Sequence, residues 1–315
     1  MINRIPVYLL TGYLGSGKTS LLKRWLSQPE FKNAALIINE LGEIGLDNQL
    51  LSAAIEPSST STLIANACIC CTGLPGLEQA LEDLFWARLE RRIPKFDCVV
   101  IETTGLAQTS PIIQSMQSNE LLAERFNLAE IVTCISAITA DQVLNLEEAR
   151  DQLHCASVVV LTKIDLLDGV KVDEIALRLD NQLRAHYSDA TVLRSSNANL
   201  LANEILGVQP QTKTYHPTKH HHDHEHTLQA HWWAMGAKVS QDELLNDIQL
   251  LKAELGNNLV RVKGIVSTNQ GVQLIELVPF ETKVAVSAYS ENQPAEFGLT
   301  IISSQIPNLK NYSNI

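Results

Sequence analysis

The chain has 315 residues, of which 45% are hydrophobic, and its formal net charge is −11. This length and hydrophobic content suffice for two domains, or for one large α/β domain with an appendage. The acidic balance argues against broad binding to nucleic-acid backbones, which needs clustered lysine and arginine, and no run approaches the ~20 apolar residues of a membrane span.

The first 20 residues, MINRIPVYLLTGYLGSGKTS, contain a short apolar run that ends in glycines. This run has neither the long hydrophobic region nor the small-residue cleavage site of a secretory signal. We therefore expect a cytoplasmic protein, in which thiols stay reduced and clustered cysteines serve metal binding or catalysis more often than disulfides.

The first two thirds of the chain alternate short apolar runs with amphipathic stretches. The apolar runs predict strands at 5–10, 34–38, 97–102, 130–135, 156–161 and 191–194. The stretches between them predict helices at 17–27, 75–91, 140–153 and 171–186. Strands that are apolar throughout and alternate with helices indicate a mostly parallel, doubly wound sheet in an α/β fold.

A phosphate-binding pattern, G-x-x-x-x-G-K-[ST], stands at GYLGSGKT, between the first predicted strand and the first predicted helix. Its glycines let the backbone turn so that N–H groups face phosphate oxygens. We expect Lys18 to reach the β- and γ-phosphates and the Thr19 hydroxyl to bind Mg²⁺. The residues expected to bind the nucleotide here are Gly12, Gly15, Ser16, Gly17, Lys18, Thr19 and Ser20.

The next glycine-containing segment, NELGEIGLD (39–47), follows a predicted buried strand. It therefore begins at the carboxyl edge of the sheet, where the nucleotide is expected. Its acidic residues Glu40, Glu43 and Asp47 fit either a solvated loop or a switch loop that brings carboxylates to a metal.

Three of the six cysteines stand within four positions, in NACICCTG (66–73). Reduced thiols at Cys68, Cys70 and Cys71 favour a metal site, while a redox thiol and a purely structural role stay open. The other three cysteines lie in or beside apolar, β-branched runs, which predicts buried core residues. These three are Cys98, Cys134 and Cys155.

An acidic residue at the end of a core strand is needed to support Mg²⁺, and CVVIETTG (98–105) provides Glu102. The alternative is that Glu102 only ends a strand. Gly105, three residues later, is expected to lie near the γ-phosphate, where a backbone N–H can sense it. Lys18, Thr19 and Glu102 are therefore the predicted catalytic residues.

The nucleobase is predicted from VVVLTKID (158–165), which places Lys163 and Asp165 at the end of a buried strand. An aspartate there accepts hydrogen bonds from the N1–H and 2-amino groups of guanine, which adenine lacks. The common form of this motif begins with Asn, and this chain has Thr162, which can still bridge to the phosphate-binding loop.

The turn after the next predicted strand, LRSSNAN (193–199), offers another contact to the base. A backbone contact from Ser195 or Ser196 to the guanine carbonyl is expected here, unless this is an ordinary turn. Together these residues predict GTP as the nucleotide, with GDP as the product.

Near residue 210 the sequence becomes polar, with two prolines and no apolar period. This predicts a nucleotide-binding domain at 1–210, a linker at 211–227 and a second domain at 228–315. The linker contains HHHDHEH, which is either a metal-loading loop or a flexible linker that binds metal incidentally. Its candidate weak metal ligands are His220, His221, His222, His224 and His226.

The last part of the chain predicts a strand at 228–239, a helix at 240–255 and two strands at 259–268 and 271–280. A short polar turn separates these last two strands. This order indicates a small α+β domain.

The motifs GYLGSGKT, NELGEIGLD, CICC, ETTG and TKID occur here in the order seen in the CobW-like P-loop GTPases, a class that includes relatives inserting nickel into urease and hydrogenase. The tryptophan pair at 232–233, a helix and RVKGIV (261–266) are similar to the CobW carboxy-terminal domain. The resemblance covers nearly the whole chain. The final EFGLTIISSQIPNLKNYSNI (296–315) departs from it, because the family usually closes with a more apolar strand that ends in glycine.

In that family the C-x-C-C motif binds a transition metal, commonly zinc, in proteins viewed as metal chaperones or activators. The resemblance implies that Cys68, Cys70 and Cys71 are the metal ligands. So cramped a run suits two or three thiolates plus a ligand from elsewhere, such as Glu40 or Glu43. GTP binding and hydrolysis would then tighten or open the site.

The sequence thus predicts a GTPase that uses Mg²⁺, binds Zn²⁺ (or cobalt or nickel) and delivers it to an unidentified client metalloprotein. Since neither a catalytic base nor an arginine finger can be assigned, slow intrinsic turnover is expected. The alternatives are a non-catalytic metal sensor or storage protein, a cobalt- or cobalamin-related GTPase and an ATP-dependent small-molecule kinase. No nucleic-acid or membrane partner is expected, and the oligomeric state stays open, with a dimer among the options.

Overall fold

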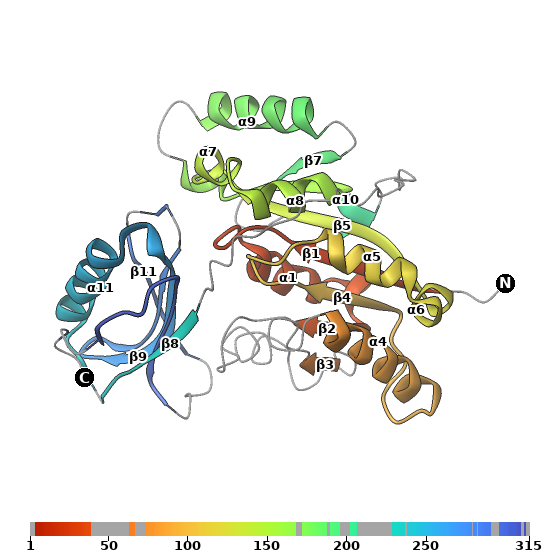
Figure 1. Cartoon of the computed structure of the whole chain (residues 1–315), viewed down its shortest axis with the longest axis horizontal. Coiled ribbons are helices and arrows are strands. Elements are labelled where there is room, and N and C mark those ends of the chain that lie inside the picture. The colour runs from red at the N-terminus through yellow and green to blue at the C-terminus, as the bar shows by residue number, and fades with distance from the viewer. Residues whose placement is uncertain are drawn as a thin grey trace. The chain divides into compact units, whose positions relative to one another are not determined.

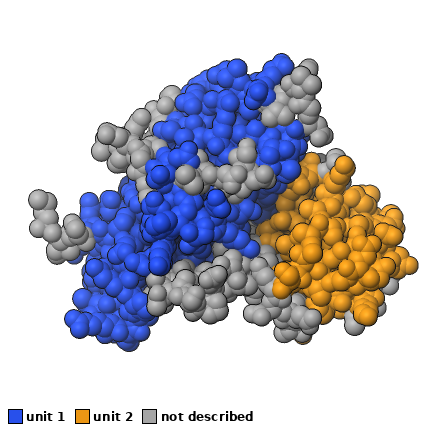
Figure 2. Space-filling model, turned by 180° about the vertical axis from the view of Figure 1, so that it is seen from behind, with its two compact units in different colours: residues 1–41, 54–218 blue, residues 42–53, 219–315 orange. Residues whose placement is uncertain are grey.

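The computed structural model divides into two compact units, residues 1–41 with 54–218 and residues 42–53 with 219–315 (Figure 2). The boundaries 210/211 and 227/228 stay predictions, since the linker at 211–227 lies outside the described residues. The structure describes residues 4–38, 63–66, 74–167, 172–187, 190–195, 202–206, 229–236, 238–278, 280–281, 283–290, 296–309 and 312.

The first unit is built on a seven-stranded sheet in the order β3-β2-β4-β1-β5-β6-β7, with every neighbouring pair parallel (Figure 1). Strands β2, β4 and β6 are buried at every residue, because helices cover both faces of a parallel sheet. The strands are β1 Ile5–Thr11, β2 Ala34–Ile38, β3 Leu63–Asn66, β4 Cys98–Glu102, β5 Phe126–Ser136, β6 Val158–Thr162 and β7 Thr191–Arg194.

Successive side chains of β1 point to opposite faces of the sheet, and their contacts show which helices cover each face. Val7 and Leu9 point into an apolar cluster beneath the layer that contains α4, α5 and α6. Tyr8 faces the other layer, where its ring packs edge-on against Phe31 at 5.2 Å between centroids, and Phe31 stacks on Trp25 of α1. The helices are α1 Lys18–Leu26, α4 Leu74–Leu89, α5 Ser110–Ser118, α6 Glu120–Arg125, α7 Ala140–Val143, α8 Glu147–Cys155, α9 Val172–His186 and α10 Ala202–Leu206.

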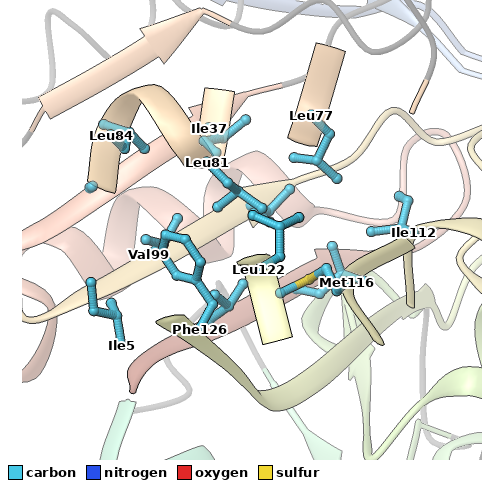
Figure 3. Close-up of a cluster of buried hydrophobic side chains, with 14 of the residues drawn as sticks. Ile5, Ile37, Leu77, Leu81, Leu84, Val99, Ile112, Met116, Leu122 and Phe126 are labelled. Atoms are coloured by element: carbon cyan, nitrogen blue, oxygen red, sulfur yellow. The ribbon is translucent and has the colours of Figure 1, made fainter. Parts of the chain in front are cut away.

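The cluster on the α4 side of the sheet joins residues from far-apart parts of the sequence (Figure 3). Helix α4 supplies leucines at a spacing of three and four residues, so that they lie on one face of the helix. Burial of these side chains holds the helix against the sheet. Its members include Ile5, Ile37, Leu77, Leu81, Leu84, Val99, Ile112, Met116, Leu122 and Phe126.

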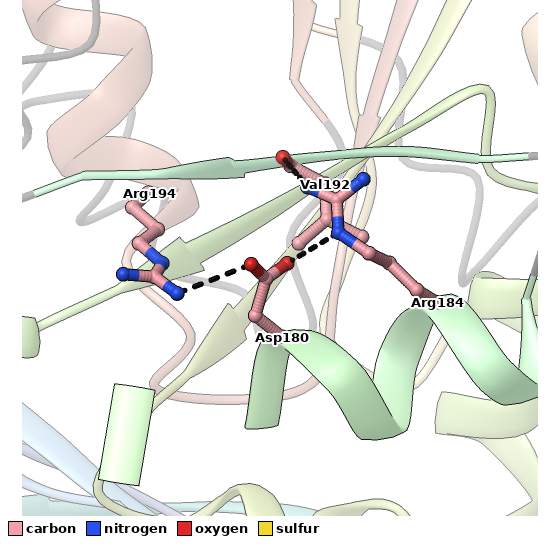
Figure 4. A network of polar contacts seen from close by, with 4 residues as sticks. All are labelled: Asp180, Arg184, Val192 and Arg194. Carbon is pink, nitrogen blue, oxygen red and sulfur yellow. Dashed lines mark hydrogen bonds and ion pairs between the residues drawn. The ribbon is translucent and has the colours of Figure 1, made fainter. Parts of the chain in front are cut away.

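Charged side chains fasten helix α9 to the edge strand β7 (Figure 4). Asp180 accepts from Arg184 Nε at 2.9 Å and from Arg194 Nη2 of β7 at 3.1 Å. Arg184 also donates to the carbonyl of Val192 at 3.0 Å. These bonds fix the end of the sheet from which the predicted base-binding turn continues.

The second unit is a five-stranded sheet in the order β11-β10-β9-β12-β8, with every neighbouring pair antiparallel. Helix α11 packs its apolar face, including Leu244 and Ile248, on one side of this sheet. The Ser240 hydroxyl caps the helix by accepting from the N–H of Glu243. The elements are β8 Gln229–Ala234, α11 Gln241–Leu255, β9 Leu259–Thr268, β10 Gly271–Leu277, β11 Ala285–Ala288 and β12 Gly298–Ser303.

The predicted α/β fold with a smaller α+β part is confirmed, with some differences in detail. The helix predicted at 140–153 is two helices, because Leu146 adopts extended backbone with ψ of 145°. Strands β3, β11 and β12 and helices α5, α6 and α10 were not predicted from the sequence. Within the described part of the chain, no helix combines the length and apolar character needed to cross a membrane.

Candidate functional site

The loop between β1 and α1 takes a shape that needs glycine. Gly12, Gly15 and Gly17 have φ angles of 137°, 73° and 87°, which side-chain-bearing residues rarely adopt. Gly12 also lies so close to the β5 backbone at Cys134 that an added Cβ would clash with its carbonyl oxygen. The predicted phosphate-binding residues from Gly12 to Ser20 are thus brought together in one tight turn at the start of α1.

Lys18 curls back over this loop. Its ammonium donates to the carbonyl of Gly12 at 2.7 Å and to that of Tyr13 at 3.2 Å, and only 8% of the residue is exposed. The loop also closes on itself through the Ser16 N–H, which donates to the carbonyl of Tyr13. A cation held in the curve of a glycine loop at a helix N-terminus is suited to phosphate.

Thr19 and Glu102 meet beside the loop. The Thr19 hydroxyl donates to Glu102 Oε1 at 2.7 Å, and Glu102 is 4% exposed. Strand register explains the meeting, since Glu102 at the end of β4 lies opposite Leu10 of β1 and Ile38 of β2. A hydroxyl and a carboxylate are both hard oxygen donors, so this pair fits Mg²⁺.

Thr162, at the end of β6, bridges to the loop as the sequence predicts. Its hydroxyl donates to the carbonyl of Ser16 at 2.7 Å and lies 3.2 Å from that of Ile135 in β5. Directly after it, Lys163 has a φ of 56°, which turns the chain and presents Asp165 at the surface. The structure thus places the predicted base-reading aspartate in a turn whose preceding strand is tied to the phosphate-binding loop.

Ser195 directly follows β7, and one of its backbone groups already has a partner in the sheet. Its N–H donates to the carbonyl of Leu161 at 2.8 Å and so continues the sheet ladder. That N–H is already engaged in the sheet, and Ser196, the other residue predicted to contact the base, lies outside the described residues. Among the described residues, the buried Ser195 hydroxyl has no hydrogen-bond partner.

The segment after Glu102 packs directly on the phosphate-binding loop. A Cβ added to Gly105 would stand 2.5 Å from the backbone nitrogen of Leu14, so only glycine allows this approach. Thr103 donates a side-chain bond to Thr11 at 2.9 Å and so ties the segment to the end of β1. The predicted phosphate-sensing glycine therefore adjoins the loop.

Helix α8 contributes two residues that the sequence interpretation missed. Gln152 donates to the carbonyls of Gly105 and Ala107, and Asp151 accepts from the N–H groups of Thr109 and Ser110. Gln152 could have been found from the helical spacing of buried residues in α8. Gln152 stands three residues after Ala149 on the buried face of the helix, where a polar residue needs a partner.

The cysteines outside the CICC motif are buried, as predicted. Burial raises the pKa values of Cys98 and Cys134 to about 12, so both thiols stay protonated at neutral pH. Within the described ranges, no group of three or more His, Cys, Asp or Glu side chains could hold a metal ion. The predicted transition-metal ligands lie outside those ranges; they are Glu40, Glu43, Cys68, Cys70, Cys71, His220, His221, His222, His224 and His226.

Comparison with known proteins identifies related chains. A family model described as "CobW/HypB/UreG, nucleotide-binding domain" matches residues 6–192. The zinc chaperone YjiA of Escherichia coli is 31% identical over 272 residues, which cover 84% of this chain and 82% of YjiA. The zinc-regulated GTPase metalloprotein activator 1 of Schizosaccharomyces pombe is 34% identical over 173 residues, covering 53% of this chain and 41% of the activator. The crystal structure of Zn(II)-bound YjiA from Escherichia coli aligns with 98% of this chain and 97% of the YjiA chain. The two are 24% identical in sequence, and the TM-score is 0.47.

Proposed function

Because the chain belongs to the CobW/HypB/UreG family of nucleotide-binding proteins, we propose that it is a GTP-hydrolysing metallochaperone. It binds a transition metal and delivers it to a client metalloprotein under nucleotide control. Zinc is the proposed metal, and cobalt and nickel are the alternatives. The names of the relatives, a zinc chaperone and a zinc-regulated GTPase, support this proposal. The observation that carries the GTPase part is the contact between Thr19 and Glu102 beside the glycine loop.

In this proposal the phosphate chain of GTP lies in the loop formed by residues 12–20. Lys18 exchanges its contacts with loop carbonyls for the β- and γ-phosphates, and Gly105 presents its N–H to the γ-phosphate. Thr19 and Glu102 would hold Mg²⁺, which when bound offsets phosphate charge. Asp165 accepts hydrogen bonds from guanine.

The proposed coupling between the nucleotide and the metal site is supported by the order of strands β3, β2 and β4. Asn66, the last residue of β3, lies in register with Ile38 of β2, which itself lies opposite Glu102 of β4. In the sequence, Cys68 follows Asn66 by two residues, and Glu40 follows Ile38 by two. Both proposed metal-binding segments therefore leave the sheet from the edge that carries Glu102, which supports control of the metal by the nucleotide.

Intrinsic hydrolysis is proposed to be slow. The sequence motifs assign neither a general base nor an arginine finger, the groups that accelerate the best GTPases. Metal or the client protein would supply the acceleration. A rate above about 1 s⁻¹ for the isolated protein, against typical unassisted rates far below that, contradicts this part of the proposal.

The proposal is tested by the zinc affinity of the reduced full chain, measured by chelator competition with GDP and then with a non-hydrolysable GTP analogue. We expect the two affinities to differ by about fivefold or more, which is within the usual range of coupling between two sites. The difference is expected to vanish when Cys68, Cys70 and Cys71 are changed to Ser.

Deletion of residues 220–226 is the matched control. It removes histidines that bind metal weakly, so we expect it to reduce loose zinc binding and to keep the difference between nucleotides. Equal zinc affinity with both nucleotides rejects nucleotide control and leaves a metal storage protein. Tighter binding of ATP than of GTP rejects the guanine assignment.

A further inference from the structure

A buried amide on α8 holds the segment that adjoins the phosphate-binding loop. Gln152 Nε2 donates to the carbonyl of Gly105 at 3.2 Å and to that of Ala107 at 3.0 Å, and Gln152 is 0% exposed. Two carbonyl acceptors require the NH₂ group on this side, because the amide oxygen would repel them. The contacts thus fix the orientation of the amide.

The amide oxygen of Gln152 is buried, and among the described residues it has no hydrogen-bond partner. A buried acceptor without a donor weakens the folded state, and the two hydrogen bonds donated by the same amide offset this cost. What the glutamine provides is therefore its pair of donors to residues 105 and 107. This is a positional requirement of that segment.

The far end of the same segment is held by the neighbouring residue of α8. Asp151 accepts from the N–H groups of Thr109 and Ser110 at 2.5 and 3.2 Å, where α5 begins. Helix α8 is itself fixed to the sheet, since the Thr133 hydroxyl of β5 donates to the carbonyl of Gln152. The segment between β4 and α5 is thus held by one helix, at Gly105 and Ala107 in its middle and at the start of α5.

We propose that Gln152 is the positioning residue that sets Gly105 for contact with the γ-phosphate and so determines the preference for GTP over GDP. This inference rests on the proposed function. Glycine has wide conformational freedom, and Gln152 restricts it by holding the Gly105 carbonyl while the Gly105 Cα lies against Leu14. GDP has no γ-phosphate and gains nothing from this restriction.

The test compares the affinities of the full chain for GDP and for a non-hydrolysable GTP analogue, in the wild type and in Gln152→Met. Methionine keeps the volume and removes both donors. We expect the affinity for the GTP analogue to fall about tenfold and that for GDP to change less than about twofold, because only the γ-phosphate contact is lost. Gln142→Met, at an exposed position of α7, is the matched control and is expected to change neither affinity.

If Gln152 has a purely structural role, its replacement lowers the affinities for both nucleotides equally or lowers only the unfolding temperature. Either result overturns the inference. If Gln152→Met does not fold, Gln152→Asn keeps the amide but withdraws it by one methylene, and the same change in the GTP to GDP ratio is expected. If the wild type binds guanine nucleotides and the variants keep the same ratio of GTP-analogue to GDP affinity, the inference about Gln152 is overturned and the proposed function stands. A wild type that binds neither nucleotide rejects the proposed function itself, and this inference with it.

Discussion

Glu130 lies within β5 with 5% of its surface exposed, and Ser157 donates a hydrogen bond to one of its carboxylate oxygens. Burial raises its pKa above the ordinary value of 4.5, and the hydrogen bond from Ser157 lowers it only in part. The folded chain therefore binds this proton more tightly than the unfolded chain does. Stability falls as pH rises through the window between the ordinary and the raised pKa, and the full penalty applies above it.

Glu130→Gln removes this penalty and keeps an oxygen that can accept from Ser157. We expect the variant to unfold at a higher temperature than the wild type at about pH 8, with the gain disappearing below about pH 4, where Glu130 becomes protonated in both states. Thermal unfolding followed at several pH values measures this. Lower stability of the variant at pH 8 would mean that the ionised carboxylate is satisfied by its surroundings.

At the scale of elements, the start of α5 depends on a neighbouring helix. Its N-cap residue Thr109 makes no side-chain capping bond in the described structure, and Asp151 of α8 instead accepts from the first N–H groups. Asp151→Ala is therefore expected to lower the free energy of unfolding by about 1–2 kcal/mol, the usual effect of losing a cap.

Urea unfolding of Asp151→Ala measures this loss, and Asp141→Ala on the exposed surface of α7 is a suitable comparison. Asp141 pairs with Arg178, and such exposed pairs contribute about 0–1 kcal/mol. An effect of Asp151→Ala no larger than that of Asp141→Ala would show that α5 does not need the cap.

The elements that the sequence predicted well are those with strong internal patterns. Strands such as 34–38 are apolar at every position, and the glycines and Lys18 of the phosphate-binding loop have a fixed spacing that reflects backbone geometry. Burial of Cys98, Cys134 and Cys155 also followed from their apolar neighbours.

What could not be predicted depends on partners far away in the sequence. The four residues of β3 form a strand by pairing with β2, and α5 begins where Asp151 of α8 supplies acceptors. Such contacts leave little trace in local composition.

At the scale of the whole molecule, each unit has its own apolar core. Helix α11 and its sheet enclose one cluster, and the parallel sheet with its helices encloses others. A ligand stabilises the unit that binds it, by about 2.7 kcal/mol at a free concentration of 100 times its Kd.

We therefore expect two thermal transitions, of which a GTP analogue with Mg²⁺ raises only that of the parallel-sheet unit. Calorimetry measures both in one scan. Lys18→Ala serves as the control, because it removes the phosphate-binding cation and is expected to abolish the shift. A single transition that moves as a whole on binding would indicate that the two units unfold together.

The buried thiols of β4, β5 and α8 also determine how this protein can be labelled. Maleimides react with the thiolate, and Cys98 and Cys134, with pKa values of about 12, provide almost none at neutral pH. Cys155 is enclosed between α8 and α5, beside Ser110. Rapid attachment of a fluorophore to the native chain would thus report on Cys68, Cys70 and Cys71 without any cysteine being replaced first. Under the proposed function, the labelling rate of the wild-type chain is expected to rise as metal leaves these three thiols.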